Sequence, residues 1–193
     1  GKVVRAALFG GDAPIKVAKH DTLAIDCSSS SPPDTLSLAK ELSQLGIGLI
    51  DSPVSGAQKG ADEGTLTLMV GGEPDLVKRA DPVLRSMGKS IFHTGPLGSG
   101  HAMKALNNFV AAAGYSAAVE ALLAGRRFGL DPARMLAIMN SSTGRNFNTE
   151  VVLQEHVVNE RYATGFSLGL LAKDVGIAAD VMNKDAVDGL FEE

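Results

Sequence analysis

The chain has 193 residues, of which 45% are hydrophobic and 21% charged, a composition typical of a folded protein of one or two domains. A formal net charge of −4 without a block of Lys and Arg argues against nucleic acid as the main partner. Residues 1–9 are too short an apolar stretch for a signal peptide, and no run approaches the roughly 20 residues that span a membrane. One cysteine, Cys27, fits a reducing compartment, so we expect a cytoplasmic protein.

Short apolar runs alternate with helical patterns in the first half of the chain. Strands are predicted at residues 22–27, 47–52, 65–70 and 90–94. Helices are predicted at residues 35–45, after Pro32-Pro33-Asp34, and from Pro74 onward, since proline favours the first helical position. Alternating strands and helices indicate an α/β sheet.

The second half of the chain shows only helical patterns. Helices are predicted at residues 101–128, 133–139, 149–159 and 167–182. The first would be about 42 Å long if it is continuous. We therefore place a domain boundary near Pro96, with one domain at residues 1–96 and the other at 97–193.

A glycine-rich turn opens the long helix and is followed by a lysine. Lys104 and Asn108 are four residues apart, so they share one helix face. A lysine on a largely apolar helix has two interpretations. It can extend its ammonium to the surface, or burial can lower its pKa and suit it to proton transfer in catalysis.

The loop that follows the second predicted strand, at residues 51–66, is rich in small and polar residues. Ser55, Gly56 and Ala57 could offer a hydroxyl and backbone N–H groups to a small carboxylate. The loop follows the carboxyl end of a strand, where open α/β sheets bind ligands. The alternative is a structural loop whose glycines only permit tight turns.

Three ordered motifs, at residues 51–72, at residues 98–108 and at Lys173-Asp174, together resemble the β-hydroxyacid dehydrogenase family, in particular its 3-hydroxyisobutyrate dehydrogenase-like members. The resemblance implies part of a Rossmann-type NAD(P)-binding domain, followed by an all-α domain like that of 6-phosphogluconate dehydrogenase. It also implies NAD or NADP as cofactor, a small 3-hydroxy acid as substrate, and a homodimer or homotetramer.

The resemblance assigns roles to individual residues. Lys104 matches the catalytic lysine, and Asn108 matches a partner that orients substrate. Ser55, Gly56 and Ala57 match the loop that holds the substrate carboxylate, although many members have a second glycine in place of Ala57.

Further positions match residues near the cofactor. Ser29 stands where a threonine usually contacts it, Lys173 matches a motif lysine followed by Asp174, and Phe166 would form a wall of the nicotinamide pocket. Arg145 has two interpretations: it pairs with a substrate carboxylate or phosphate, or it forms a structural ion pair or helix cap.

These residue types suit hydride transfer from an alcohol. The departing hydride requires loss of the hydroxyl proton to a positioned base, and an ammonium stabilises alkoxide character. His93, His101 and His156 have no metal-ligand spacing, so we expect no metal.

The sequence departs from the family in one respect, because it has no G-x-G-x-x-G fingerprint after an initial strand. Relative to the family, we expect the chain to begin inside the nucleotide-binding domain. We interpret it as an incomplete sequence; the alternative is an inactive fragment or a scaffold of the same fold, for which Lys104 and Asn108 would be unnecessary. The choice between NAD and NADP depends on a residue of the unmatched segment.

Two other enzyme classes fit less well. Ser55 lacks the G-x-S-x-G context of a hydrolase nucleophile. Cys27 ends an apolar strand, where a lone cysteine usually contributes to packing.

Overall fold

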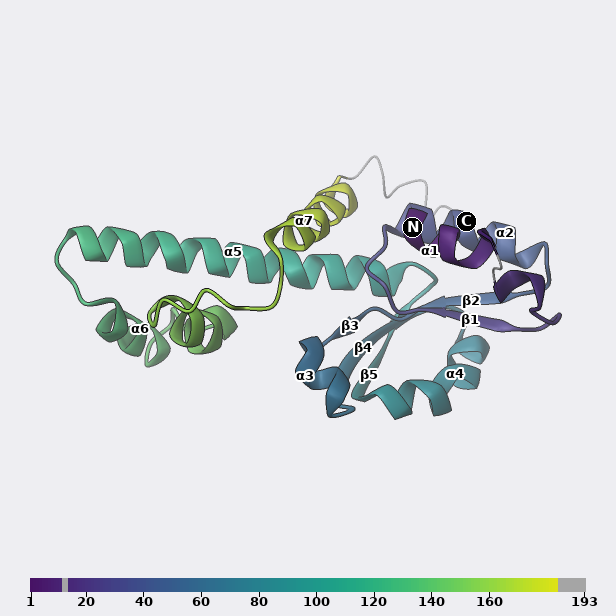
Figure 1. The fold of residues 1–193 in the computed structure, drawn as a ribbon, viewed down its shortest axis with the longest axis horizontal. Coiled ribbons are helices and arrows are strands. Elements are labelled where there is room, and N and C mark those ends of the chain that lie inside the picture. The colour runs from purple at the N-terminus through teal and green to yellow at the C-terminus, as the bar shows by residue number, and fades with distance from the viewer. Residues whose placement is uncertain (12–13, 184–193) are drawn as a thin grey trace. The chain divides into compact units, whose positions relative to one another are not determined.

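The computed structural model describes residues 1–11 and 14–183. Contacts within the chain define two compact units (Figure 1). The first contains Gly1–Leu106 and the described residues from Ile177 onward, and the second is Asn107–Gly176. The predicted division between residues 96 and 97 stays a prediction.

The first unit contains a five-stranded mixed sheet. Its strands are β1 (Leu23–Asp26), β2 (Gly48–Asp51), β3 (Val54–Ser55), β4 (Leu66–Gly71) and β5 (Gly88–Gly95). The order is β1-β2-β4-β3, and β5 pairs with β4. The β1–β2 and β4–β5 pairs are parallel, whereas β4 runs antiparallel to both β2 and β3. All four predicted strands are present; the sequence did not predict β3.

Both predicted helices of this unit are present: one begins at Pro74 as predicted, and the other begins at Pro32 and ends at Ser43 instead of spanning residues 35–45. The helices and turns are α1 (Lys2–Phe9), η1 (Pro14–Lys16), α2 (Pro32–Ser43), α3 (Ala57–Asp62) and α4 (Pro74–Met87). In α2, the Ser31 hydroxyl accepts a hydrogen bond from the backbone N–H of Asp34, which satisfies one of the unpaired donors of a helix start. The sequence predicted neither α1 nor α3, and α3 lies inside the stretch expected to be a loop.

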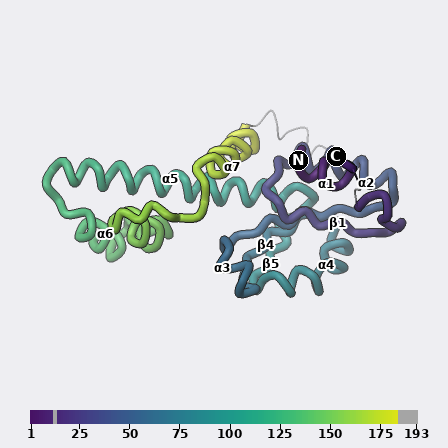
Figure 2. Tube along the Cα trace, in the orientation of Figure 1, coloured from purple at the N-terminus to yellow at the C-terminus, as the bar shows by residue number. Residues whose placement is uncertain are grey.

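Side chains on the two faces of β2 join different hydrophobic clusters. Ile50 belongs to the cluster with Leu84 of α4, and Leu49 to the cluster with Leu42 of α2. Successive side chains of a strand point to opposite faces. Helices α2 and α4 therefore cover opposite faces of the sheet (Figure 1 and Figure 2).

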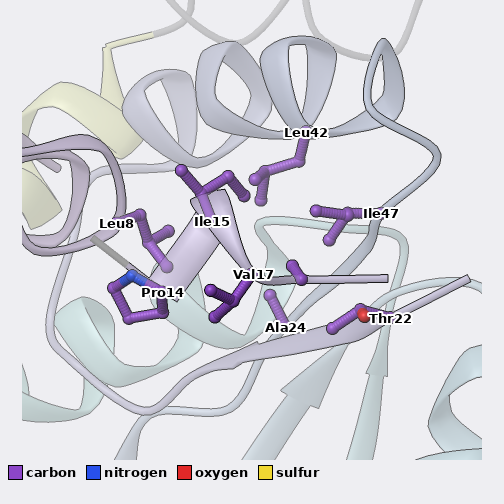
Figure 3. A pocket seen from close by; sticks show the side chains of 9 residues that line it. Leu8, Pro14, Ile15, Val17, Thr22, Ala24, Leu42 and Ile47 are labelled. Carbon is purple, nitrogen blue, oxygen red and sulfur yellow. The ribbon is translucent and has the colours of Figure 1, made fainter. Parts of the chain in front are cut away.

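An apolar pocket of about 210 Å³ adjoins the Leu42 cluster (Figure 3). Its walls come from α1, η1, β1, α2 and the segments beside them. Leu8, Ile15 and Leu42 point into it, and Thr22 is the polar residue in its wall. The described residues that line it are apolar apart from Thr22, so the pocket is continuous with the Leu42 cluster.

The second unit is helical, as predicted for this part of the chain. Its elements are most of α5 (Ser99–Arg127), α6 (Pro132–Asn140), the π-helix η2 (Asn148–Val157) and much of α7 (Leu168–Met182). Leu122, Leu136 and Leu153 form its buried core. The predicted helix at 149–159 is therefore a π-helix rather than an α-helix, a difference that apolar spacing does not reveal. Among the described helices, none has the length and apolarity to span a membrane.

Candidate functional site

A buried carboxylate binds the start of the long helix α5. Asp51 is the last residue of β2 and is fully buried. Its Oδ1 accepts a hydrogen bond from the N–H of Gly98, and its Oδ2 accepts one from the N–H of His101, both at 2.7 Å. A carboxylate at this position satisfies helix-terminal donors and interacts favourably with the helix dipole. Asp51 therefore fixes the first turn of α5 at the carboxyl end of β2.

The turn before α5 lies so close to the sheet that two positions in this region have no room for a side chain and are glycines. A Cβ atom on Gly71 would lie 2.4 Å from Asp51 Oδ1, and one on Gly100 would lie 2.2 Å from the carbonyl oxygen of Met69. Gly98 has a φ of +91°, which L residues rarely adopt. The glycine-rich turn read from the sequence is therefore required by packing against Asp51 and β4.

His101, in the first turn of α5, is buried and hydrogen-bonded at both ring nitrogens. Its Nδ1 lies 2.7 Å from the Thr35 hydroxyl, and its Nε2 donates to the carbonyl oxygen of Ser28 at 3.1 Å. The carboxylates of Asp26 and Asp51 lie 3.9 and 3.7 Å from the ring nitrogens. Burial lowers the pKa of His101, and the two carboxylates partly oppose that shift.

A turn of four serines follows β1 and is bound by a second buried carboxylate. Asp26 Oδ1 accepts a hydrogen bond from the N–H of Ser28 at 2.9 Å, and Oδ2 lies 3.5 Å from the hydroxyl of Ser30. The hydroxyls of Ser28 and Ser30 are 2.9 Å apart. Ser29, the predicted cofactor residue, lies between them in the chain. Asp26 and Asp51 are paired in the parallel β1–β2 register, so the turn and the start of α5 share the edge where such sheets bind ligands.

Lys104 lies on α5, one turn after His101, and its side chain is half-buried. The residue therefore has the helical position that the sequence predicted, close to the turn that Asp51 fixes. Its role as acid and base stays a prediction.

The predicted carboxylate loop has a specific backbone conformation. Ser55 ends β3 opposite Thr67, and Gly56 is the N-cap of α3 with a φ of +133°. Ala57 has a φ of +52°, in the left-handed region that favours glycine. This conformation gives a physical reason for a second glycine at the position of Ala57 in the family. Gly56 has a structural role of its own, because its φ of +133° at the start of α3 is a conformation that favours glycine.

In the second unit, three predicted residues from α5 and α7 come together. Asn108 Nδ2 donates to Asp174 Oδ2 at 2.6 Å, and Lys173 Nζ forms an ion pair with Asp174 Oδ1 at 3.1 Å, without hydrogen-bond geometry. Asn108 is 8% exposed and Asp174 only 2%. The Asp174 carboxylate therefore orients the Asn108 amide, a contact that the sequence did not predict.

The remaining candidates have simpler surroundings. Phe166 is 48% exposed, and its predicted role at the nicotinamide stays a prediction. Arg145 forms an ion pair with Glu150, with 3.2 Å between Nε and Oε1, in agreement with the structural interpretation. Burial raises the pKa of the Cys27 thiol, which disfavours a thiolate nucleophile.

Comparison with known families assigns both halves of the sequence. Residues 1–95 match the model of the NAD binding domain of 6-phosphogluconate dehydrogenase. Residues 98–188 match the model of the NAD-binding domain of NADP-dependent 3-hydroxyisobutyrate dehydrogenase. The chain belongs to the β-hydroxyacid dehydrogenase family. Its fold is accordingly a Rossmann-like sheet followed by a helical C-terminal domain.

Individual relatives agree with this assignment. The chain is 36% identical to 2-(hydroxymethyl)glutarate dehydrogenase of Eubacterium barkeri, over 92% of this chain and 59% of the relative. It is 35% identical to 3-hydroxyisobutyrate dehydrogenase of Pseudomonas aeruginosa, over 92% of this chain and 62% of the relative. The chain thus spans about three-fifths of the length of these dehydrogenases.

A solved structure has the same fold. The 3-hydroxyisobutyrate dehydrogenase of Mycobacterium tuberculosis, determined with L-serine, superposes with a TM-score of 0.83 at 32% identity. The match covers 100% of this chain and 65% of that protein.

Replacing Asp51 with Asn should destabilise the first unit strongly. The amide oxygen can accept only from one side, so its NH2 group would face one of the two N–H donors at the start of α5. We expect Asp51→Asn to lower the free energy of unfolding by about 2–4 kcal/mol, measured by urea denaturation. Asp81→Asn, which removes an exposed i,i+4 pair with Arg85, is the control and should cost less than about 0.5 kcal/mol. Equal effects of the two variants would contradict the capping role of Asp51.

The lowered pKa of His101 should make stability depend on pH. Between the lowered native pKa and about 6.5, the unfolded chain binds a proton that the native chain does not, so stability rises with pH. We expect the stability of the wild type to fall as the pH decreases from about 7 toward about 5, and His101→Gln to reduce that slope. Urea unfolding across this range measures the effect. If the unfolding free energy depends on pH equally in both proteins, His101 is not the cause of that dependence.

Proposed function

We propose that this chain forms part of an NAD(P)-dependent oxidoreductase that interconverts a small 3-hydroxy acid and its 3-oxo acid or semialdehyde. The observation that carries the proposal is the pair of buried aspartates at the carboxyl ends of β1 and β2. Asp26 holds the serine turn and Asp51 holds the start of α5, the helix that bears Lys104. Family membership supports the same conclusion.

The names of the relatives suggest a more specific substrate class. 3-Hydroxyisobutyrate, 2-(hydroxymethyl)glutarate and L-serine all contain the unit HO–CH2–CHR–COO⁻. We propose that this chain recognises the same unit. In oxidation, the alcohol O–H and one adjacent C–H bond break and a C=O bond forms. The carboxylate carbon is two bonds from the carbon that is oxidised, and the carboxylate is the anionic group by which the substrate would be bound.

We propose that the described residues supply part of the binding site for a nicotinamide dinucleotide. Such a cofactor, when bound, accepts or returns the hydride. The serine turn after β1 lies where parallel sheets bind nucleotides, and Ser29 would hold the cofactor there. Lys173, Phe166 and Asp174 are proposed further contacts, on their match to the family motif. The 193 residues contain no G-x-G-x-x-G turn for the pyrophosphate.

The proposed chemistry assigns one role to each remaining residue. Lys104 accepts the hydroxyl proton during oxidation and returns it to the carbonyl oxygen during reduction. Its ammonium form stabilises negative charge on that oxygen. Ser55, Gly56 and Ala57 bind the substrate carboxylate, and Asn108 orients the substrate. The hydrogen bond from Asn108 to Asp174 supports this last role, because it fixes which way the amide faces.

The proposal extends to assembly and location. Several large apolar side chains of the described second unit are exposed, among them Phe128 (85%), Phe147 (66%) and Leu168 (80%). Apolar surface of this kind favours subunit contacts, which supports a homodimer or homotetramer. The single cysteine supports a reducing, cytoplasmic location.

Removing the Lys104 amine should abolish most of the turnover. We expect Lys104→Ala to lower kcat by about two to four orders of magnitude, as for loss of a general acid and base. Affinity for NADH or NADPH, measured by fluorescence titration, should change little. Lys40→Ala, on the outer side of α2, is the matched control and should keep wild-type kcat. Normal turnover of the Lys104 variant would exclude the proposed role.

Removing the Ser55 hydroxyl should weaken substrate binding more than catalysis. A lost hydrogen bond to a carboxylate costs about 1.5–3 kcal/mol, so we expect KM for the hydroxy acid to rise at least about tenfold in Ser55→Ala. Ser37→Ala, on α2, serves as the control. Steady-state kinetics with 3-hydroxyisobutyrate and L-serine measure the effect, and an unchanged KM would remove Ser55 from the site.

A further inference from the structure

The serine turn after β1 is held from two sides. On one side, the Asp26 carboxylate accepts from the N–H of Ser28 and lies near the Ser30 hydroxyl. On the other, His101 Nε2 donates to the Ser28 carbonyl oxygen. The two residues that flank Ser29 are therefore both fixed by buried groups.

The hydrogen bond from His101 also sets the orientation of the next peptide unit. The Ser28 carbonyl and the Ser29 N–H belong to one planar peptide group, and the described chain has no cis peptide bond. In a trans peptide the C=O and N–H point in opposite directions. Holding the Ser28 oxygen toward the imidazole therefore directs the Ser29 N–H away from it.

His101 couples this turn to the helix that carries Lys104. The same residue donates its backbone N–H to Asp51, and its Nδ1 contacts the Thr35 hydroxyl on α2. Because the Ser28 oxygen is only an acceptor, the ring must carry a proton at Nε2. Burial disfavours the imidazolium, so Nε2 carries the one proton of the ring and Nδ1 is the acceptor. The Thr35 hydroxyl then shares its single proton between Nδ1, at 2.7 Å, and the Ser31 carbonyl oxygen, at 3.0 Å.

We propose that His101 is a positioning residue for the nicotinamide dinucleotide. Through its Nε2–H it fixes the peptide between Ser28 and Ser29 and so presents Ser29 to the cofactor. This inference rests on the proposed function. It adds a residue that does not touch the cofactor and whose effect is transmitted through Ser29.

Two substitutions separate the two ring contacts. The amide nitrogen of Asn stands near the position of Nδ1, whereas that of Gln stands near Nε2, so only His101→Gln can still donate to the Ser28 oxygen. We expect His101→Asn to raise Kd for NADH or NADPH about five- to tenfold, the effect of losing one buried hydrogen bond. His101→Gln should raise it less than about threefold. Thr35→Val, which removes the other ring contact, is the matched control and should bind like the wild type.

A double-mutant cycle tests whether the effect passes through Ser29. Ser29→Ala removes the hydroxyl that the fixed peptide presents, so it should weaken cofactor binding. Adding His101→Asn to it should raise Kd less than the same change does in the wild type, because only the backbone N–H of residue 29 is then left to position. Fluorescence titration of the full chain gives each Kd without requiring turnover. Additive losses, or equal losses in His101→Asn and Thr35→Val, would show a general structural role and overturn the inference.

The wild type provides a measurement that does not depend on the folding of any variant. Long-range 1H–15N NMR correlations report the tautomer of His101; we expect Nε2–H, with a change in the Nε2 shift when NADH or NADPH binds. An Nδ1–H tautomer, or an Nε2 shift unmoved by saturating cofactor, would contradict the inference. A wild type that binds neither dinucleotide would instead contradict the proposed function. Binding by the wild type with unimpaired binding by His101→Asn would contradict the inference alone.

Discussion

The two hydrogen bonds that Asp51 accepts from the start of α5 are the constraint on which the described site depends. A fully buried carboxylate is costly to desolvate, and here its two oxygens accept from the N–H groups of Gly98 and His101. Because Gly98 directly precedes α5 and His101 lies in its first turn, the interaction fixes where the helix begins. The position of Lys104 along the helix then follows from helical geometry, at about 1.5 Å per residue.

Asp26 repeats this arrangement on the neighbouring strand. It ends β1 as Asp51 ends β2, and it accepts hydrogen bonds from the serine turn. His101 lies between the two carboxylates and bonds the turn on one side and Thr35 on the other. A polar cluster buried in this way is stable only if each member has a partner, so removing one leaves the others unsatisfied. The cluster thus gives the edge of the sheet a defined structure, although the surrounding segments are turns.

Local sequence signals predicted most of the secondary structure. The prolines that begin α2 and α4 and the apolar runs of β1, β2, β4 and β5 are signals that act within a few residues, so the sequence predicted these elements. The sequence did not predict the two-residue β3, which depends on pairing with β4. It did not predict the six-residue α3 either, which begins at Gly56 and Ala57, both with a positive φ. The π-helix at 148–157 has helical apolar spacing and was predicted as an ordinary helix. The placement of Lys104 on α5, after a glycine turn, followed from the sequence alone.

By itself, the sequence determined that an α/β part is followed by a helical part. It also determined that Lys104 and Asn108 lie on one helix, and it indicated the family. The tertiary structure alone decided which side chains hold those residues in place. His101 meets Thr35 and Ser28 across 66 and 73 residues, and Asn108 meets Asp174 across 66. Hydrophobic periodicity encodes which face of an element is buried, but it carries no information about which distant polar groups will satisfy one another. That pairing is set only when the elements pack and the buried donors and acceptors must find partners.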